Sequence, residues 1–191
     1  MISIIAGILG VVELAAQSSL LTIATLAAMF PLGFAEAIMS TIGNSIGANN
    51  VSLAKKFFKV VFFISVILFS FICIGLVSFR SAIASIMTND EEVHDMIASV
   101  LIIQGCLALT HLFQLFLQGP IKALGRQNVA SVISVICNYV LGIPCCLLLA
   151  FKMEMGLKGL AIGIGVAQTS MTICFLALIL LSDWQGITDE A

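Results

Sequence analysis

A single carboxylate, Glu36, lies inside an apolar stretch that is long enough to cross a lipid bilayer. Pro31 and Gly33 interrupt the same stretch a few residues earlier. An acid in a membrane span usually faces protein or a water-filled cavity, and a proline bends the helix that contains it. The pattern predicts a bent helix on which Glu36 takes up a proton or another cation on one side of the membrane and releases it on the other. Alternatively, Glu36 lies close enough to the end of the span for its carboxylate to reach the lipid headgroups.

A second group of polar side chains lies in the apolar stretch 93–117 and just beyond it. Gln104, His111 and Gln118 follow one another at intervals of seven, which places them on one face of a helix, and Gln114 lies near the same side. Lipid cannot form hydrogen bonds with amide or imidazole groups, so this face should look into the bundle. There it would either hold helices together or line a path through the membrane.

Asn138 and Tyr139 are polar residues near the middle of a further apolar run, 129–151, and Pro144 follows them closely. Asn138 is a further candidate for the lining of a polar path. Tyr139, the next residue, is a candidate for the same lining. Pro144 predicts a second helix bend.

Two connecting segments have recognisable compositions. Gly43, Asn44 and Gly47 predict a turn at the exit of the first bent stretch. The acidic run 89–95, NDEEVHD, favours a solvated loop that begins the next helix, where acids are stabilised by the helix dipole. A cation site formed by the same acids with His94 is the alternative.

The composition is that of an integral membrane protein. Of 191 residues, 61% are hydrophobic and only 9% are charged, with a mean hydropathy of +1.20. No basic stripe is present that would indicate nucleic-acid binding. The six cysteines fall in apolar runs without metal-ligand spacing, so neither a disulfide framework nor a metal site is expected. No pairing of a nucleophile with a base suggests an enzyme, and no cofactor is expected beyond a coupling proton or sodium ion.

Because about 20 apolar residues cross a bilayer, the sequence predicts an all-α, polytopic membrane helix bundle with five complete transmembrane helices. The membrane domain is expected over 13–184. Residues 1–12 are interpreted as the end of a truncated preceding helix, and 185–191 as a cytoplasmic tail. The predicted spans are about 17–42, 60–79, 93–117, 129–151 and 157–181.

Basic residues are divided unequally between the two sets of loops. One set carries five of them and the other carries three. The excess predicts that the first set and the C-terminus are cytoplasmic, which leaves the acidic 89–95 loop on the outer side. The first set is Lys55, Lys56, Lys59, Lys122 and Arg126, and the second is Arg80, Lys152 and Lys158.

Four stretches in this order and spacing resemble the multidrug and toxic compound extrusion (MATE) family: GILGVVELAAQS, FPLGFAEAIMSTIGNSIGANN, FLQGPIKALGRQNVASVISVICNYVLGIP and GLKGLAIGIGVAQ. The resemblance implies the C-terminal lobe of a transporter built from two lobes of six helices. It further implies export of organic cations or other amphipathic compounds, driven by inward movement of protons or sodium. The matching positions are largely structural, at helix bends, turns and close approaches; they include Pro31, Gly33, Gly43, Asn44, Gly47, Asn138, Tyr139, Gly142 and Pro144.

The sequence departs from the family pattern where the coupling acids often lie. Thr22 and Gln114 stand at places where some relatives have acids in the eighth and tenth helices. Glu36 and His111 are therefore interpreted as substitutes inferred from this sequence. The expected partners are a small organic substrate, the lipid bilayer, and the missing N-terminal lobe or a second copy, in the plasma membrane or an internal vesicle membrane.

Two other functions compete with that of a transporter. A lipid-linked oligosaccharide flippase of the same superfamily would need basic residues in its cavity, and the interiors of the predicted spans contain none. A non-transporting membrane scaffold or a truncated gene product is the second alternative, because one lobe cannot enclose a two-lobed cavity.

Overall fold

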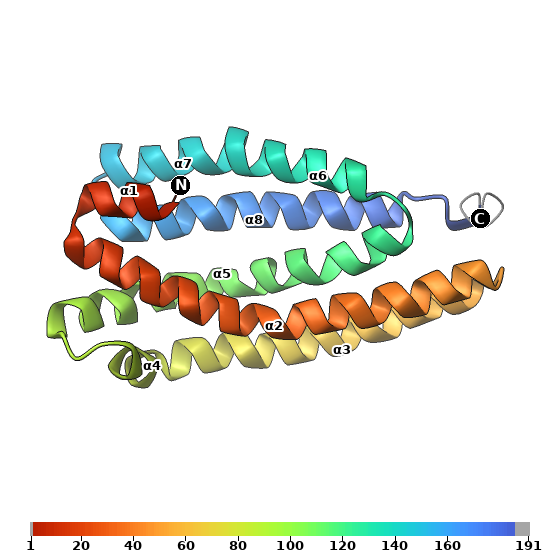
Figure 1. Ribbon diagram of the computed structural model, residues 1–191, viewed down its shortest axis with the longest axis horizontal. Helices are drawn as coiled ribbons and strands as arrows, with labels where there is room; N and C mark the ends of the chain where they lie inside the picture. Colours follow the sequence, from red (N-terminus) through yellow and green to blue (C-terminus); the bar gives the residue numbers. More distant parts are fainter. Residues whose placement is uncertain (1, 186–191) are drawn as a thin grey trace.

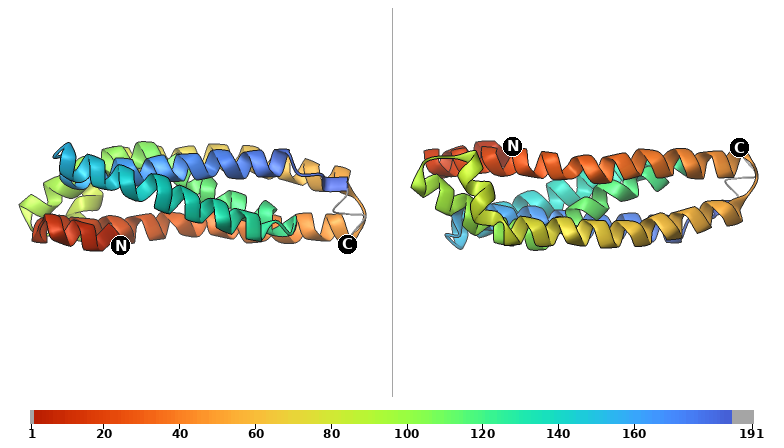
Figure 2. Two further views of the ribbon diagram at one scale, coloured as in Figure 1. Left: turned by 90° about the horizontal axis from the view of Figure 1, so that it is seen from above. Right: turned by 90° about the horizontal axis from the view of Figure 1, so that it is seen from below.

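Long helices dominate the computed structural model, which describes residues 2–185. All of the long helices follow one common direction, both in Figure 1 and in the two further views of Figure 2. The elements are α1 (Ile2–Leu9), α2 (Val11–Gly47), α3 (Val51–Ser78), α4 (Arg80–Met87), α5 (Glu91–Ala123), α6 (Gln127–Val135), η1 (Ile136–Gly142), α7 (Ile143–Leu147), η2 (Leu148–Lys152) and α8 (Gly156–Leu180).

Within residues 2–185, five helices are long and apolar enough to cross a membrane: Val11–Gly47, Val51–Ser78, Glu91–Ala123, Gln127–Lys152 and Gly156–Leu180. The fourth of these is continuous through α6, η1, α7 and η2. No strand occurs among the described residues. The all-α membrane bundle predicted from the sequence is therefore confirmed.

The helix α3 shows how the apolar surface is divided between lipid and core. Its outward side chains recur every three or four residues and are each more than a third exposed, as expected for a face that meets lipid. This stripe is Leu53, Phe57, Val60, Ile64, Ile67, Phe71 and Ile74. On the opposite side, Phe58 and Phe69 are buried and form ring contacts with other phenylalanines, among them Phe113 and Phe116 of α5.

Several helix ends lie beyond their predicted positions. The helix α2 continues to Gly47, so Gly43 and Asn44 lie in its last turns, and the expected turn occurs at residues 48–50 instead. Similarly, α5 continues to Ala123 through a segment expected to be a loop. Burial explains this extension, because Gly119 of α5 lies directly against the backbone of Ala35 in α2 and leaves no room for a side chain.

Pro31 and Pro144, two of the three prolines inside the described spans, have different effects. Pro31 is buried and α2 remains helical through it, with Gly33 exposed beyond it. Pro144 lies at the start of α7, and the wider π-type turns of η1 and η2 flank this short helix. A proline cannot donate to the carbonyl four residues earlier, and a widened turn accommodates that loss.

Small residues allow α8 to pack closely against its neighbours. A Cβ atom on Gly163 would lie 2.6 Å from the backbone nitrogen of Cys146, and one on Gly159 would lie 2.6 Å from the carbonyl carbon of Leu149. Gly165 faces the Leu107 side chain of α5. The core therefore forms around α8 and α5.

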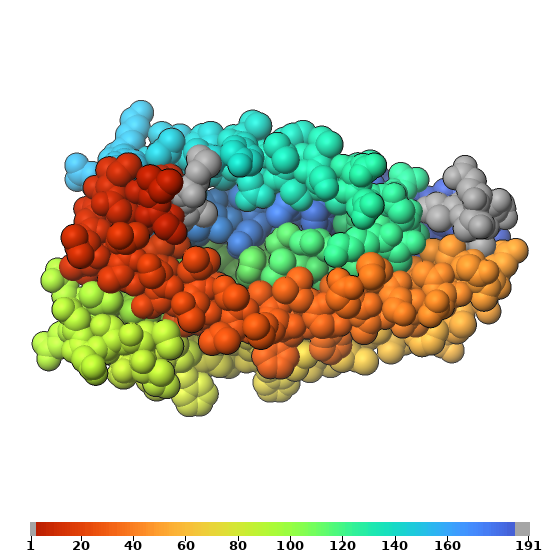
Figure 3. All heavy atoms as spheres, in the orientation of Figure 1, coloured from red at the N-terminus to blue at the C-terminus, as the bar shows by residue number. Residues whose placement is uncertain are grey.

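At the start of the chain, α1 ends at Leu9 and Gly10 adopts an extended conformation before α2 begins. The short helix α1 lies over α8, between α2 and the fourth long helix (Figure 1). Figure 3 shows that this face of the molecule is hollowed, with α5 and α8 recessed between α2 and the α6 to α7 segment.

Candidate functional site

A cavity of about 480 Å³ lies between α2, α5 and α8, with contributions from α1 and α3. Gln104 and His111 line it from α5, two helical turns apart, as their spacing predicts. Most of the remaining lining is aliphatic. The lining residues with polar side chains are Ser3, Gln17, Thr25, Gln104, His111 and Gln168. A mostly apolar wall with a few convergent polar groups, in a volume of this size, is typical of small-molecule binding sites.

His111 also links two helices. The amide nitrogen Nε2 of Gln168 in α8 lies 2.8 Å from Nδ1 of His111 in α5. Close by, the hydroxyl of Thr172 lies 2.8 Å from the backbone carbonyl of Thr110 and 2.8 Å from that of Gln168 in its own helix, so the two carbonyls share its proton. The predicted polar face of α5 therefore both hydrogen-bonds to another helix and lines a cavity, so the two interpretations of this face are not exclusive.

The other amides of that face lie elsewhere. Gln114, expected to line the path, is only 6% exposed. It lines neither this cavity nor the second, smaller cavity between α1, the fourth long helix and α8. Three residues beyond His111, a side chain is rotated by about 60° from it on a helix of 3.6 residues per turn. Gln118 is half-buried and lies beyond Leu115, the last residue of α5 that lines the cavity.

Asn138 and Tyr139 line a different cavity, of about 380 Å³, between α1, the fourth long helix and α8. Asn138 donates from Nδ2 to the carbonyl of Ser134 at 2.8 Å and lies 3.8 Å from the sulfur of Met171. Ile164 of α8 lines both cavities. The structure thus places Asn138 and Tyr139 in a different cavity from Gln104 and His111, which line the cavity between α2, α5 and α8.

The expectation that Glu36 is sheltered inside the bundle is wrong. Its side chain is 61% exposed, and its Oε1 atom lies 3.4 Å from Nζ of Lys122 at the end of α5. The buried positions of this turn of α2 belong to Ala35 and Ile38. Because α5 extends further than predicted, Lys122 reaches the carboxylate and supplies the opposite charge.

Two amides of the cavity, Gln17 and Gln168, were not among the predicted site residues. Gln17 is 6% exposed at the start of the first predicted span, and Gln168 lies within the fifth. Both carry the signal that identified Gln104, namely an amide inside an apolar run. Their convergence on one cavity depends on the packing of three helices, which no spacing within a single helix reveals.

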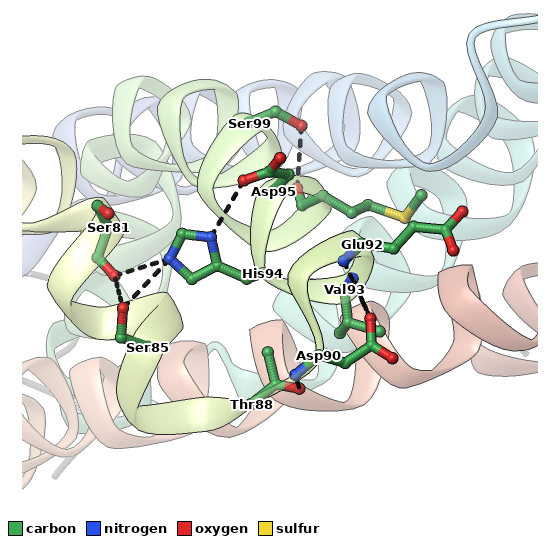
Figure 4. A network of polar contacts seen from close by, with 10 residues as sticks. Ser81, Ser85, Thr88, Asp90, Glu92, Val93, His94, Asp95 and Ser99 are labelled. Atoms are coloured by element: carbon green, nitrogen blue, oxygen red, sulfur yellow. Dashed lines mark hydrogen bonds and ion pairs between the residues drawn. The ribbon is translucent and has the colours of Figure 1, made fainter.

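A second polar cluster lies at the opposite end of α5 from Lys122 (Figure 4). Asp90 caps α5 by accepting from the backbone nitrogens of Glu92 and Val93 at 3.0 and 3.1 Å. This confirms that the acidic segment begins a helix. His94 contacts Asp95, Ser85 and the carbonyl of Ser81, which ties the short helix α4 to α5.

The fold and the cavity together define a polytopic helical membrane protein with a small-molecule-sized cavity. A family model described as MatE matches residues 1–148, and the chain belongs to this family of multidrug and toxic compound extrusion proteins.

Known proteins similar to this chain agree with that assignment. Multidrug and toxin extrusion protein 1 of Oryctolagus cuniculus is 32% identical over 99% of this chain, and the chain spans 33% of that relative's length. The crystal structure of the eukaryotic MATE transporter AtDTX14 matches with a TM-score of 0.90 and 21% identity, over 94% of this chain and 40% of that one. An inward-facing MATE transporter of the MOP superfamily matches with a TM-score of 0.84 and 18% identity, over 100% of this chain and 43% of that one.

Proposed function

We propose that this chain forms one lobe of a secondary active transporter that exports organic or xenobiotic compounds in exchange for protons or sodium ions. The observation that carries the proposal is the cavity between α2, α5 and α8, with its aliphatic wall and its group of amides and an imidazole. A site of this kind accepts amphipathic solutes by apolar contact and orients them by a small number of hydrogen bonds.

The chain spans about a third of the length of the curated relatives it matches, so the transport cycle requires a second body. We propose that an N-terminal lobe, or a second copy, covers the hollowed face of Figure 3 and completes the cavity. Alternating access then follows from rocking of the two lobes about a site near the middle of the membrane.

Orientation in the membrane follows from charge. The end of the bundle at the α2–α3 and α5–α6 connections carries five basic residues, and the opposite end carries three, among the described residues. We place the first end, where α8 also finishes, in the cytoplasm.

We propose Glu36 as the coupling group, acting through an exposed ion pair and not as the sheltered carboxylate expected from the sequence. It lies in an ion pair with Lys122 that joins α2 to α5, beside the close contact of Ala35 with Gly119. Protonation of Glu36 would break the pair, and a change in the α2–α5 contact would accompany the movement of the coupling ion. An exposed ion pair contributes little to stability, so it can be broken and remade at low cost.

Transport by the complete gene product in proteoliposomes tests the proposal. A fluorescent organic solute should move against its gradient when a pH or sodium gradient is imposed. In Glu36→Gln, solute exchange should persist while its dependence on the ion gradient is lost. Glu92→Gln, which removes an exposed acid at the other end of the bundle, is the matched control and should behave like wild type. Ion-driven transport by Glu36→Gln at the wild-type rate would contradict the coupling role.

The same assay separates the alternatives. A flippase requires basic groups for a pyrophosphate, and the described residues that line the two cavities include no lysine or arginine. A scaffold would bind its partner lobe but move no solute under any gradient.

A further inference from the structure

The polar wall of the larger cavity consists of uncharged groups. Among the described lining residues, from α1, α2, α3, α5 and α8, none carries a carboxylate, an ammonium or a guanidinium group. The only titratable side chain of the lining is the imidazole of His111. A charged group that entered this lobe's cavity would lose water without meeting an opposite charge there, which is costly. The walls that this lobe contributes therefore suit an uncharged part of the solute.

The partner of His111 determines which ring nitrogen carries the proton. The Gln168 nitrogen at 2.8 Å is an amide NH₂ group, which donates and does not accept. Nδ1 of His111 is therefore the acceptor, and in the neutral ring the proton lies on Nε2.

Helix packing holds this arrangement in place. Thr172 bonds from α8 to the carbonyl of Thr110, the residue next to His111, and Gly165 lets α8 approach Leu107 of α5. The charged residues of the elements packed around His111, such as Glu36, Lys122 and Lys158, do not line the cavity. The tautomer of His111 thus depends on Gln168 rather than on a nearby charge.

We infer that the cavity binds the uncharged part of a mainly apolar solute that carries a neutral hydrogen-bond acceptor, such as an aromatic ring nitrogen or a carbonyl oxygen. The Nε2–H group of His111 donates to that acceptor, and Gln168 is a positioning residue that holds His111 in the required tautomer. Aliphatic side chains of α2, among them Leu20 and Leu32, contact the apolar part of the solute. The inference rests on the proposed function, since it names the solute class of that site.

Three probes of similar outline test the solute class: naphthalene without an acceptor, quinoline with one, and N-methylquinolinium with a fixed charge. Each is titrated against the complete protein in lipid nanodiscs. Quinoline should bind about fivefold more tightly than naphthalene, as expected for one hydrogen bond, and more tightly than the cation. The difference between quinoline and naphthalene should vanish in His111→Leu and persist in Asn138→Leu, which alters the other cavity. Tightest binding of the cation, or an unchanged difference in His111→Leu, would overturn the inference.

Magnetic resonance tests the tautomer without reference to transport. The chain has two histidines, so His94→Gln leaves His111 as the only imidazole signal. At neutral pH, ¹⁵N-labelled protein should show the Nε2–H tautomer. Gln168→Leu should release a mixture of tautomers, and Gln168→Glu should give a doubly protonated ring because a carboxylate accepts from Nδ1. An Nδ1–H tautomer or a charged ring in the wild-type sequence would refute the assignment of Gln168.

The two experiments distinguish the inference from the function on which it rests. Absence of transport, together with the expected tautomer and probe order, would reject the transporter and leave the binding site. Transport with the wrong tautomer or probe order would reject the binding site alone.

Discussion

The two histidines of α5 have opposite surroundings. His94, near the start of the helix, has Nδ1 at 3.1 Å from a carboxylate oxygen of Asp95 and Nε2 at 3.3 Å from the carbonyl of Ser81. Ser85 lies 3.2 Å from the same Nε2, and its own proton is donated to the Ser81 carbonyl. Both nitrogens of His94 thus face acceptors (Figure 4). His111 instead receives a hydrogen bond at Nδ1 from an amide.

This difference shows that the neighbouring helix assigns the role of each imidazole. His94 contacts Ser81 and Ser85 of α4 as well as Asp95, and so holds α4 against α5. A neutral ring has one donor and one acceptor, and Gln168 uses the acceptor of His111, which leaves the donor for the cavity. Residue type and helix position alone would treat the two as equivalent.

The largest effect is expected when α8 is pushed away from α5. Gly165→Val places two methyl groups and a Cβ atom against Leu107, and overpacking of this kind costs about 1–3 kcal/mol. Thermal unfolding in detergent should show this loss of stability. The His111 resonance should lose its Nε2–H signature, while the His94 resonance should be unchanged. Gly75→Val is the matched control, because beyond the adjoining backbone of its own helix no atom lies within 4 Å of the position of its Cβ. Equal losses in both variants would argue against a specific α5–α8 contact.

A smaller effect is expected from the hydroxyl that bridges the same two helices. Thr172→Val preserves side-chain shape but removes the hydroxyl that is shared between the Thr110 carbonyl and the Gln168 carbonyl of its own helix; hydrogen bonds between membrane helices contribute about 0.6–1 kcal/mol. Ser170→Ala removes a hydroxyl of α8 that bonds only within its own helix, to Val166. The unfolding free energy should therefore fall in the first variant and change little in the second. A larger loss in Ser170→Ala would show that the bridge is unimportant.

The smallest effect is expected at His94, where the network is open to water. His94→Leu removes the contacts of the ring with Asp95, Ser85 and the carbonyl of Ser81, so amide hydrogen exchange in α4 should become about two- to fivefold faster. His111→Leu should leave exchange in α4 unchanged. Unchanged exchange in His94→Leu would show that this ring does not hold α4 against α5.

Much of the architecture could be predicted from local sequence. Five apolar runs of sufficient length predict five membrane helices, because hydropathy and length are properties of a segment alone. Asp90 before two glutamates predicts the start of α5, and the glycines of α8 predict close packing. The seven-residue spacing of Gln104 and His111 correctly places both on the cavity side of one helix.

The arrangement between helices could not be predicted in the same way. Glu36 lies outward beside Lys122, since Ala35 and Ile38 occupy the buried side of α2. That choice depends on where α5 crosses, and α5 itself extends through Gly119 and Pro120 only because Ala35 packs there. The local sequence around a single polar residue in an apolar run does not distinguish whether its side chain faces lipid, a neighbouring helix or a cavity.

The membrane environment, the number of spans and the polar face of α5 follow from the order of residues within single segments, so they can be predicted from local sequence. Packing between helices is what brings Gln168 to His111, puts Asn138 in a different cavity and pairs Glu36 with Lys122. These contacts join residues far apart in the chain, and their geometry comes from the packing of small residues between helices.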